Sequence, residues 1–179
     1  MPNLPATYDW LNEIGQLPRM VEEALKLFGT VEQPGPGNNA VILKWAEFIG
    51  GDVARDYNAD SIPWCGLFMA VVARRAGKTP VAAPLWALNW GKFGQSAGQP
   101  SLGDVLTFIR PSGGHVALYI GEDKTTYHVL GGNQSDKVCF TRLPKDRLRT
   151  AREPDYMNRP ASAKPYLVAA DGEISIDEH

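Results

Sequence analysis

One cysteine in this chain has the sequence surroundings of a nucleophile. Cys65 follows a Pro-Trp dipeptide and opens an apolar segment with helical spacing, which ends at Gly77 after two arginines. We therefore expect the thiol at the N-terminus of a helix, where backbone N–H groups and the helix dipole favour the thiolate. The alternative interpretation is a small buried residue that takes part in no chemistry.

A cysteine nucleophile needs a base, and the sequence contains three histidines. His115 opens a run that alternates like a strand, and the two glycines before it let the backbone pass close to another element. His128 lies in the next predicted strand, and His179, the last residue of the chain, is expected to fray. We expect His115 to be the base; a surface histidine on a hairpin is the alternative.

A catalytic imidazole also needs an acceptor on its other ring nitrogen. Counting outward from a turn at Asp123 sets His115 opposite about residue 131, close to Asn133 and three residues from His128. Three residues of strand span roughly 10 Å, which is too far for a direct hydrogen bond. The two glycines before Asn133 also allow a bulge. The expected acceptor is Asn133, followed by His128 and then by Gln134 and Asp136.

The elements that would position these residues divide the chain into a helical first half and a strand-rich second half. Helical spacing and glycine stops predict helices at 18–28, from Asn38 or Asn39 to Ile49, and from Cys65 to Ala76, with a short helix or turn around Trp86 and Trp90. Apolar alternation predicts strands at 104–110, 115–120, 126–130 and 138–143. Short connections between successive strands imply an antiparallel meander, so the expected fold class is α+β, with the helices packed on the sheet.

Length and composition predict one domain with a substantial core, since the chain has 179 residues, of which 44% are hydrophobic. A net charge of −2 gives no electrostatic footprint for nucleic acid or an anionic membrane. No apolar run reaches the length of a membrane span, and the first ten residues lack the basic and apolar regions of a signal peptide. We expect a monomer that binds no nucleic acid, does not insert into membranes, and is made in the cytoplasm.

Neither a disulfide nor a structural zinc site is expected. Cys139 lies in a predicted strand, and a disulfide to Cys65 would consume the candidate nucleophile. The chain has no CxxC or HxxxH spacing. Asp56, Asn58 and Asp60 place oxygen ligands at alternate positions, as calcium loops do, but the glycine and the acid that complete an EF-hand are missing. A solvated turn is the favoured interpretation of these three residues, and calcium is the alternative.

Four short motifs occur in the order found in a known group of enzymes. They are Pro-Gly-Pro-Gly-Asn-Asn at 34–39, Pro63-Trp64-Cys65, Gly114-His115-Val116 and Gly131-Gly132-Asn133-Gln134. Together with the order of helix and sheet, they resemble the CHAP and NlpC/P60 families of papain-like cysteine peptidases, and most closely a CHAP-related group of phages and bacteria. The resemblance covers residues 17–150. It leaves 1–16 as an N-terminal extension and 151–179 as a C-terminal extension, either an extended wrap or a loose tail.

The resemblance implies a papain-like fold and a peptidoglycan hydrolase that cleaves an amide in or next to the stem peptide. It implies Cys65 as the nucleophile, His115 as the base and Asn133 or His128 as the third residue. Trp64, Trp86 and Tyr119 could line an aromatic groove for glycan or peptide, although each could instead pack in the core. No cofactor is implied beyond the calcium that some CHAP domains carry. With no signal peptide, delivery to the wall would follow phage lysis or a secretion system.

Two other functions fit the same residues. One is a papain-fold amidase or isopeptidase with a substrate outside the wall, such as a secreted toxin. The other is a catalytically idle domain that only binds cell wall. The paired Cys65 and His115 argue against the idle domain, because a pure binder needs neither residue.

Overall fold

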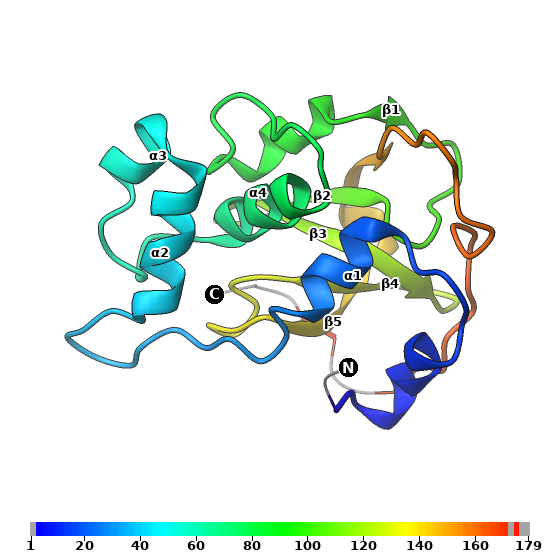
Figure 1. Ribbon diagram of the computed structural model, residues 1–179. Helices are drawn as coiled ribbons and strands as arrows, with labels where there is room; N and C mark the ends of the chain where they lie inside the picture. The colour runs from blue at the N-terminus through cyan, green and yellow to red at the C-terminus, as the bar shows by residue number, and fades with distance from the viewer. Residues whose placement is uncertain (1–2, 172–173, 176–179) are drawn as a thin grey trace.

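The helices lie on one face of a curved antiparallel sheet in the computed structural model, which describes residues 3–171 and 174–175 (Figure 1). Histidine 179 lies outside the described residues. The helical elements are η1 (Ala6–Asn12), α1 (Arg19–Leu25), α2 (Ala40–Ile49), α3 (Gly51–Asp56), α4 (Cys65–Arg75), η2 (Ala87–Lys92) and η3 (Lys145–Arg147). The strands are β1 (Gln95–Ser96), β2 (Val105–Arg110), β3 (Gly113–Glu122), β4 (Thr126–Gly131), β5 (Cys139–Pro144) and β6 (Leu148–Glu153). The predicted α+β class is confirmed.

The sheet has the strand order β1-β6-β2-β3-β4-β5, and the described pairings between these strands are antiparallel. Its β2–β5 part is the predicted meander. Strand β6 was not predicted: it returns past the whole meander and pairs with β2 from Val105↔Arg152 to Phe108↔Leu148. The domain that was expected to end at residue 150 therefore continues through β6.

Local signals set the helix ends. Asn39 is the N-cap of α2, where its side chain accepts a hydrogen bond from the Val41 backbone N–H at 2.8 Å. Gly50 ends α2 with a φ of 72°, a conformation that glycine adopts without strain. The predicted stop is correct, and α3, a second short helix that the sequence did not predict, starts directly at Gly51.

Both terminal segments pack against the sheet. Trp10 of η1 stacks on Tyr166 with ring centroids 4.6 Å apart. The backbone N–H of Glu122 donates to the Tyr166 carbonyl at 2.8 Å, and that of Val168 donates to the Glu122 carbonyl at 2.9 Å. Figure 1 shows the last part of the chain running along the edge of the molecule toward the N-terminal helix. The described part of the C-terminal segment is therefore an extended wrap, not a loose tail.

The sheet is buried on both faces. Val116, Leu118 and Ile120 of β3 face the core beneath the helices. Ala117 and Tyr119 of the same strand join a second apolar cluster on the opposite face, with Leu106, Phe108, Tyr127, Val129 and Leu143. Side chains that alternate along β3 therefore pack into two apolar clusters, one on each face of the sheet. For this reason the apolar part of the strand has no row of side chains that faces solvent.

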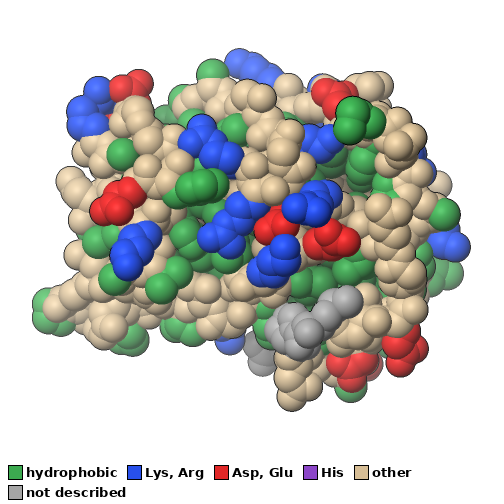
Figure 2. Space-filling view, in the orientation of Figure 1, with side chains coloured by type: hydrophobic (Ala, Val, Ile, Leu, Met, Phe, Trp, Pro, Cys, Tyr) green, Lys and Arg blue, Asp and Glu red, His purple; other side chains and the backbone are tan. Residues whose placement is uncertain are grey.

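A group of charged side chains lies on the helical face. Figure 2 shows Lys and Arg side chains gathered over the middle of this face, with Asp and Glu side chains between them. On α1, Glu23 lies 3.4 Å from Arg19 and 2.7 Å from Lys26, so part of the positive charge is offset within the helix. Within the described ranges, no helix is long and apolar enough to cross a bilayer.

Candidate active site

Cys65 is the first residue of α4 and lies at one wall of a cleft. Its side chain is only 4% exposed. The backbone N–H groups of Cys65, Gly66 and Val116 hydrogen-bond to the thiol. Burial nevertheless raises the pKa of Cys65 above its ordinary value of 9.0, against the effect of these donors and of the Arg110 charge. The expected helix-terminus stabilisation is present, but desolvation outweighs it, and the resting group is the neutral thiol.

Gly66 lets the first turn of α4 pack against the loop that leads to η2. A Cβ at this position would lie 2.2 Å from the Pro84 carbonyl oxygen and 2.7 Å from that of Leu85. Both contacts are with backbone, which cannot easily give way. Any side chain at residue 66 would therefore push α4 and its thiol away from this loop.

His115 is the third residue of β3, next to the point where this strand meets the start of α4. The Val116 N–H that contacts the thiol belongs to the residue directly after the histidine. Gly114 makes this approach possible, because a Cβ there would lie 2.5 Å from the Leu88 side chain of η2. The predicted close approach is confirmed at Gly114 but not at Gly113, where a Cβ would meet nothing within 4 Å. The histidine itself is 1% exposed, and its neighbours Gly113 and Gly114 line the cleft.

Gln134 orients the His115 ring. The Gln134 Oε1 atom lies 3.0 Å from His115 Nε2. The Gln134 Nε2 atom donates to the Cys139 carbonyl at 2.5 Å, which fixes the amide so that its oxygen faces the ring. An amide oxygen only accepts, so Nε2 carries the proton of the neutral imidazole. In this tautomer Nδ1 is the ring nitrogen that carries the lone pair and is therefore the basic one.

Asn133 is not the acceptor that the sequence predicted. It has a φ of 55° and is buried, yet its Oδ1 has no hydrogen-bond partner among the residues the structure describes. The β3–β4 register is Leu118↔Leu130, two residues from the predicted one, with an irregularity between Tyr119 and Gly121. Gln134 instead folds back over β4, since a Cβ on Gly131 would lie 2.7 Å from its Oε1.

His128, the second predicted acceptor, lies outside this site. Its Nε2 is 3.1 Å from Asp123 Oδ2, and its Nδ1 is 2.9 Å from the Tyr8 hydroxyl. Asp123 is also held by Arg142, with 2.8 Å between Oδ2 and Nη2. Burial raises the pKa of Asp123, but hydrogen bonds from Thr126, from the Thr125 backbone and from Arg142 hold it well below its usual range. Both nitrogens of His128 are therefore engaged: Nδ1 ties η1 to β4 through Tyr8, and Nε2 contacts the Asp123 carboxylate.

The His128 cluster predicts a pH effect on stability. Burial lowers the pKa of His128 in the folded protein below its ordinary 6.5, so the unfolded chain binds more protons in mild acid. The stabilisation is present above pH 6.5 and declines as the pH falls through 6.5 toward 5. Thermal unfolding should show a melting temperature that decreases over this window. His128→Gln should lower the melting temperature at pH 8 and flatten its pH dependence; an unchanged slope in the variant would contradict this origin.

Two of the three predicted substrate-contacting aromatics are core residues. Trp64 and Tyr119 are both 0% exposed. The indole N–H of Trp64 donates to Glu32 Oε2 at 3.0 Å, and its ring meets Trp45 edge-on at 5.9 Å. Tyr119 packs in the second cluster because both faces of β3 are covered. Neither can touch a ligand in the cleft, so the alternative interpretation, packing in the core, is correct for both.

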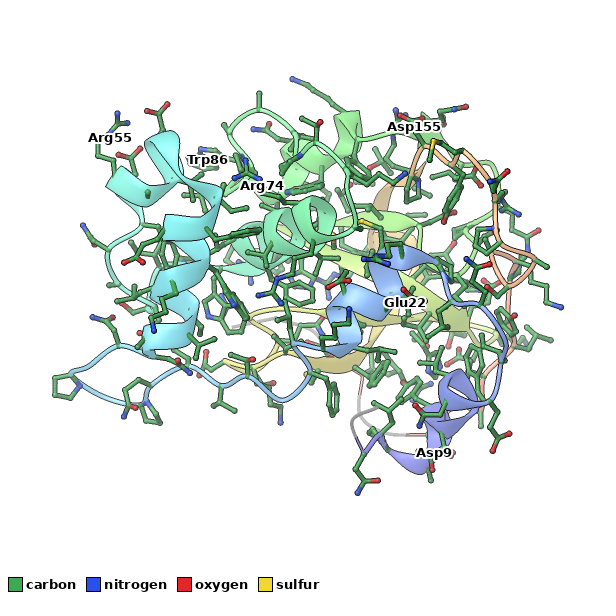
Figure 3. The ribbon with its side chains drawn as sticks, viewed as in Figure 1. Asp9, Glu22, Arg55, Arg74, Trp86 and Asp155 are labelled. Atoms are coloured by element: carbon green, nitrogen blue, oxygen red, sulfur yellow. The ribbon has the colours of Figure 1, made fainter. Side chains whose placement is uncertain are left out.

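Trp86 is the aromatic residue at the cleft. It is 73% exposed and lies on the loop between α4 and η2, where Figure 3 labels it on the side of α3 and Arg55. The cleft has a volume of about 700 Å³. Its walls are mainly apolar, and its lining residues are Asp56, Ile62, Pro63, Cys65, Leu85, Trp86, Ala87, Leu88, Asn89, Arg110, Ser112, Gly113 and Gly114. A substrate lying along this wall would contact Trp86 and reach the Cys65 thiol.

The structure gives no support to calcium at Asp56, Asn58 and Asp60. Both oxygens of Asp56 accept hydrogen bonds from Arg55, at 2.7 and 3.1 Å. Asp60 is buried and turns the other way: its Oδ2 accepts the backbone N–H groups of Gln33 and Asn39 at 2.9 and 2.7 Å. Within residues 3–171 and 174–175, no group of three or more His, Cys, Asp or Glu side chains could hold a metal ion. Asp60 instead ties the glycine-rich loop to the segment before α4.

Sequence reasoning missed Arg110 and ranked Gln134 low. Arg110 is the last residue of β2 and pairs with Gly113, two residue pairs along from Phe108↔His115. The available signal in the sequence was a positive charge at the end of an apolar strand, shortly before two glycines. The only signal for Gln134 was its place in the Gly-Gly-Asn-Gln motif.

Cys65 and Cys139 are both free thiols. No family model and no curated protein matches the chain, so the interpretation of the site depends on its own geometry.

Proposed function

We propose that this chain is a papain-like cysteine hydrolase that cleaves an amide bond of peptidoglycan, in or next to the stem peptide. One observation carries the chemistry: a cleft-lining cysteine at a helix N-terminus lies against the backbone of Val116, directly after a histidine whose Nε2 is held by a fixed amide. A domain that only binds cell wall would need no oriented imidazole. The four motifs and the exposed Trp86 in the cleft favour a wall substrate.

The first half of the reaction would acylate the enzyme. Cys65 Sγ bonds to the carbonyl carbon while its proton passes to His115 Nδ1. This coupling suits a thiol that burial keeps neutral at rest. The negative charge on the carbonyl oxygen would be met by the backbone N–H at the start of α4. The C–N bond then breaks, and the imidazolium gives its proton to the leaving amine.

The second half would release the acid. Water attacks the thioester carbon and gives a proton to His115, the S–C bond breaks, and the imidazolium returns the proton to the thiolate. Through both halves Gln134 Oε1 stays the acceptor of the Nε2–H, so the ring keeps one orientation while Nδ1 gains and loses a proton. Gln134 is thus a positioning residue, whereas Cys65 and His115 touch the reacting atoms.

Purified sacculi test the substrate. Wild-type protein should clear a suspension of sacculi, and protein whose Cys65 has been blocked with iodoacetamide should not. Mass spectrometry of the soluble fragments should show one kind of new amine with its matching carboxylate, which identifies the bond. If the sacculi stay intact while the protein hydrolyses other peptides, the same reaction would belong to an amidase or isopeptidase whose substrate lies outside the wall.

A further inference from the structure

We propose that Trp86 and Asn89 form a subsite for an N-acetylated amino sugar in the cleft of Cys65. The Trp86 indole would stack on the sugar ring, and the Asn89 side chain would accept a hydrogen bond from the acetamido N–H. The choice of this ligand rests on the proposed function, because the glycan strands of peptidoglycan consist of such sugars. The two side chains and the groups that they leave open come from the structure itself.

Trp86 offers an uncovered aromatic surface. It is 73% exposed, and among the described residues no other ring stacks on its indole. It borders two cavities, the cleft of about 700 Å³ and a neighbouring cavity of about 360 Å³. An indole in water leaves apolar area that a ligand can cover, and its electron-rich face attracts the C–H groups on one side of a sugar ring.

The loop that carries Trp86 packs directly on the start of α4. A Cβ on Gly66 would lie 2.2 Å from the carbonyl oxygen of Pro84 and 2.7 Å from that of Leu85, the two residues before Trp86. Gly66 in turn follows Cys65. A sugar stacked on the Trp86 ring would therefore lie beside the bond that the thiol attacks.

Asn89 presents a hydrogen-bond acceptor in the same cleft. Its Nδ2 atom lies 3.3 and 3.1 Å from the carbonyl oxygens of Ala82 and Ala83, which only accept, so this end of the amide is the NH2 group. The Oδ1 atom at the other end receives no hydrogen bond from the described residues. The amide is thus held at its donor end and open at its acceptor end.

The ring and the acceptor form one surface. The Asn89 backbone N–H donates to the Trp86 carbonyl at 3.0 Å, so the two residues are one 3₁₀ turn apart at the start of η2. Side chains three positions apart in such a turn eclipse each other. Both residues line the cleft, together with the apolar Ala87 and Leu88 between them.

An acetamido sugar matches this surface better than a plain sugar or a peptide does. Its N–H meets the open Asn89 Oδ1, its methyl group meets the apolar wall, and its ring covers the indole. A plain sugar lacks the acetamido N–H and methyl, so it loses both contacts and a hydrogen bond worth a severalfold change in affinity. A peptide chain offers N–H groups but not the flat C–H face that the exposed Trp86 ring would cover.

Two trisaccharides test the subsite without any hydrolysis. Chitotriose consists of three N-acetylglucosamine units, and cellotriose has the same rings and linkage without the acetamido groups. A ligand-observed NMR titration gives both dissociation constants. We expect wild-type protein to bind chitotriose at least about fivefold more tightly than cellotriose. The acetamido methyl should receive the strongest saturation transfer from the protein.

Trp86→Ala should weaken chitotriose binding by at least about tenfold. The ring is largely exposed, so its removal should leave the melting temperature unchanged. Phe48→Ala is the matched control: it removes another exposed aromatic ring, on α2 outside the cleft, and should change neither affinity. Equal losses in the two variants would mean that the sugar binds exposed rings without a site.

Asn89→Leu should lower the affinity for chitotriose to that for cellotriose. Asn89→Asp keeps an acceptor but loses the donors to Ala82 and Ala83, so it should retain the preference even if both affinities fall. If Asn89 only held the loop, Asn89→Leu would weaken both sugars equally and leave their ratio unchanged. That result, equal binding of the two sugars by the wild type, or binding of a stem peptide but not of chitotriose would overturn the proposal.

A stem peptide that carries its N-acetylated sugar and the same peptide without the sugar extend the test to turnover. Wild-type protein should cleave the sugar-bearing peptide with a KM about tenfold lower, and Trp86→Ala should lose this difference. Selective binding of chitotriose by a protein that leaves sacculi intact would uphold the subsite and refute only the hydrolase. Hydrolysis of sacculi by a protein that does not bind chitotriose would refute only the subsite.

Discussion

Cys65→Ser should lower the rate of amide hydrolysis by at least about 10³-fold while leaving the fold unchanged. Serine keeps the size of the side chain and the contacts with the N–H groups of Cys65, Gly66 and Val116. Its hydroxyl is a far weaker acid than a thiol, and a single imidazole cannot activate it as readily. Release of new amino groups from a stem peptide measures the loss, and a melting curve verifies the fold. Activity within tenfold of the wild type would rule out Cys65 as the nucleophile.

His115→Ala isolates the contribution of the base to the same step. Without the imidazole, the buried Cys65 thiol can ionise only to bulk water, and its pKa lies above the ordinary 9.0. Its alkylation by iodoacetamide should therefore be slow at pH 7 and rise about tenfold per pH unit up to pH 9. The wild type should react faster at pH 7 and show a shallower pH dependence. Identical pH profiles would mean that His115 does not assist the thiol.

The parts of the site that could be predicted from sequence are those that depend on short segments. Cys65 begins a helix whose start, apolar stripe and end are all encoded within 15 residues, and His115 begins a strand marked by its own glycines. Asn39 marks a helix start in the same local way. Each of these features depends on backbone rules that act over a few residues, so no knowledge of the rest of the fold is needed.

What could not be predicted depends on contacts between distant segments. Strand β6 pairs with β2 across 40 to 47 residues, and its own sequence carries no apolar alternation strong enough to mark it. Trp64 and Tyr119 are of residue types that often bind ligands. They are core residues here because Trp64 packs against Trp45 and Tyr119 packs in the second cluster. Tertiary packing decided the role of each aromatic residue, as it commonly decides strand propensity.

The residue that orients His115 could not be predicted, because it depends on the β3–β4 register and on the loop after β4. The pair Glu122↔Tyr127 centres the turn between Lys124 and Thr125 rather than on Asp123, and beyond the irregularity between Tyr119 and Gly121 the count is still two residues off. After β4 the chain takes up positive φ at Asn133, Ser135 and Asp136. These turns carry the Asn133 amide away from the ring and bring Gln134 onto it. Neither effect has a signature that could be counted from the sequence.

Gln134→Ala should lower kcat by about 10- to 100-fold and change KM little, which tests this corrected assignment. Without the amide oxygen, the His115 ring has no fixed acceptor for its Nε2–H, so it can rotate or carry its proton on Nδ1, where it cannot act as a base. The pH profile of Cys65 alkylation should then move toward that of His115→Ala. A merely structural role of Gln134 would leave that profile unchanged.

Two further variants separate orientation from packing. Gln134→Glu keeps an acceptor for the ring but sets a second acceptor against the Cys139 carbonyl oxygen, so it should recover only part of the lost kcat. Asn133→Gly is the matched control, because glycine takes the φ of 55° without strain and removes the amide that the sequence favoured. It should stay within about threefold of the wild type, since the Oδ1 atom it deletes bonds to nothing in the described part of the chain. A larger loss from Asn133→Gly than from Gln134→Ala would restore Asn133 as the positioning residue and require the loop after β4 to rearrange when substrate binds.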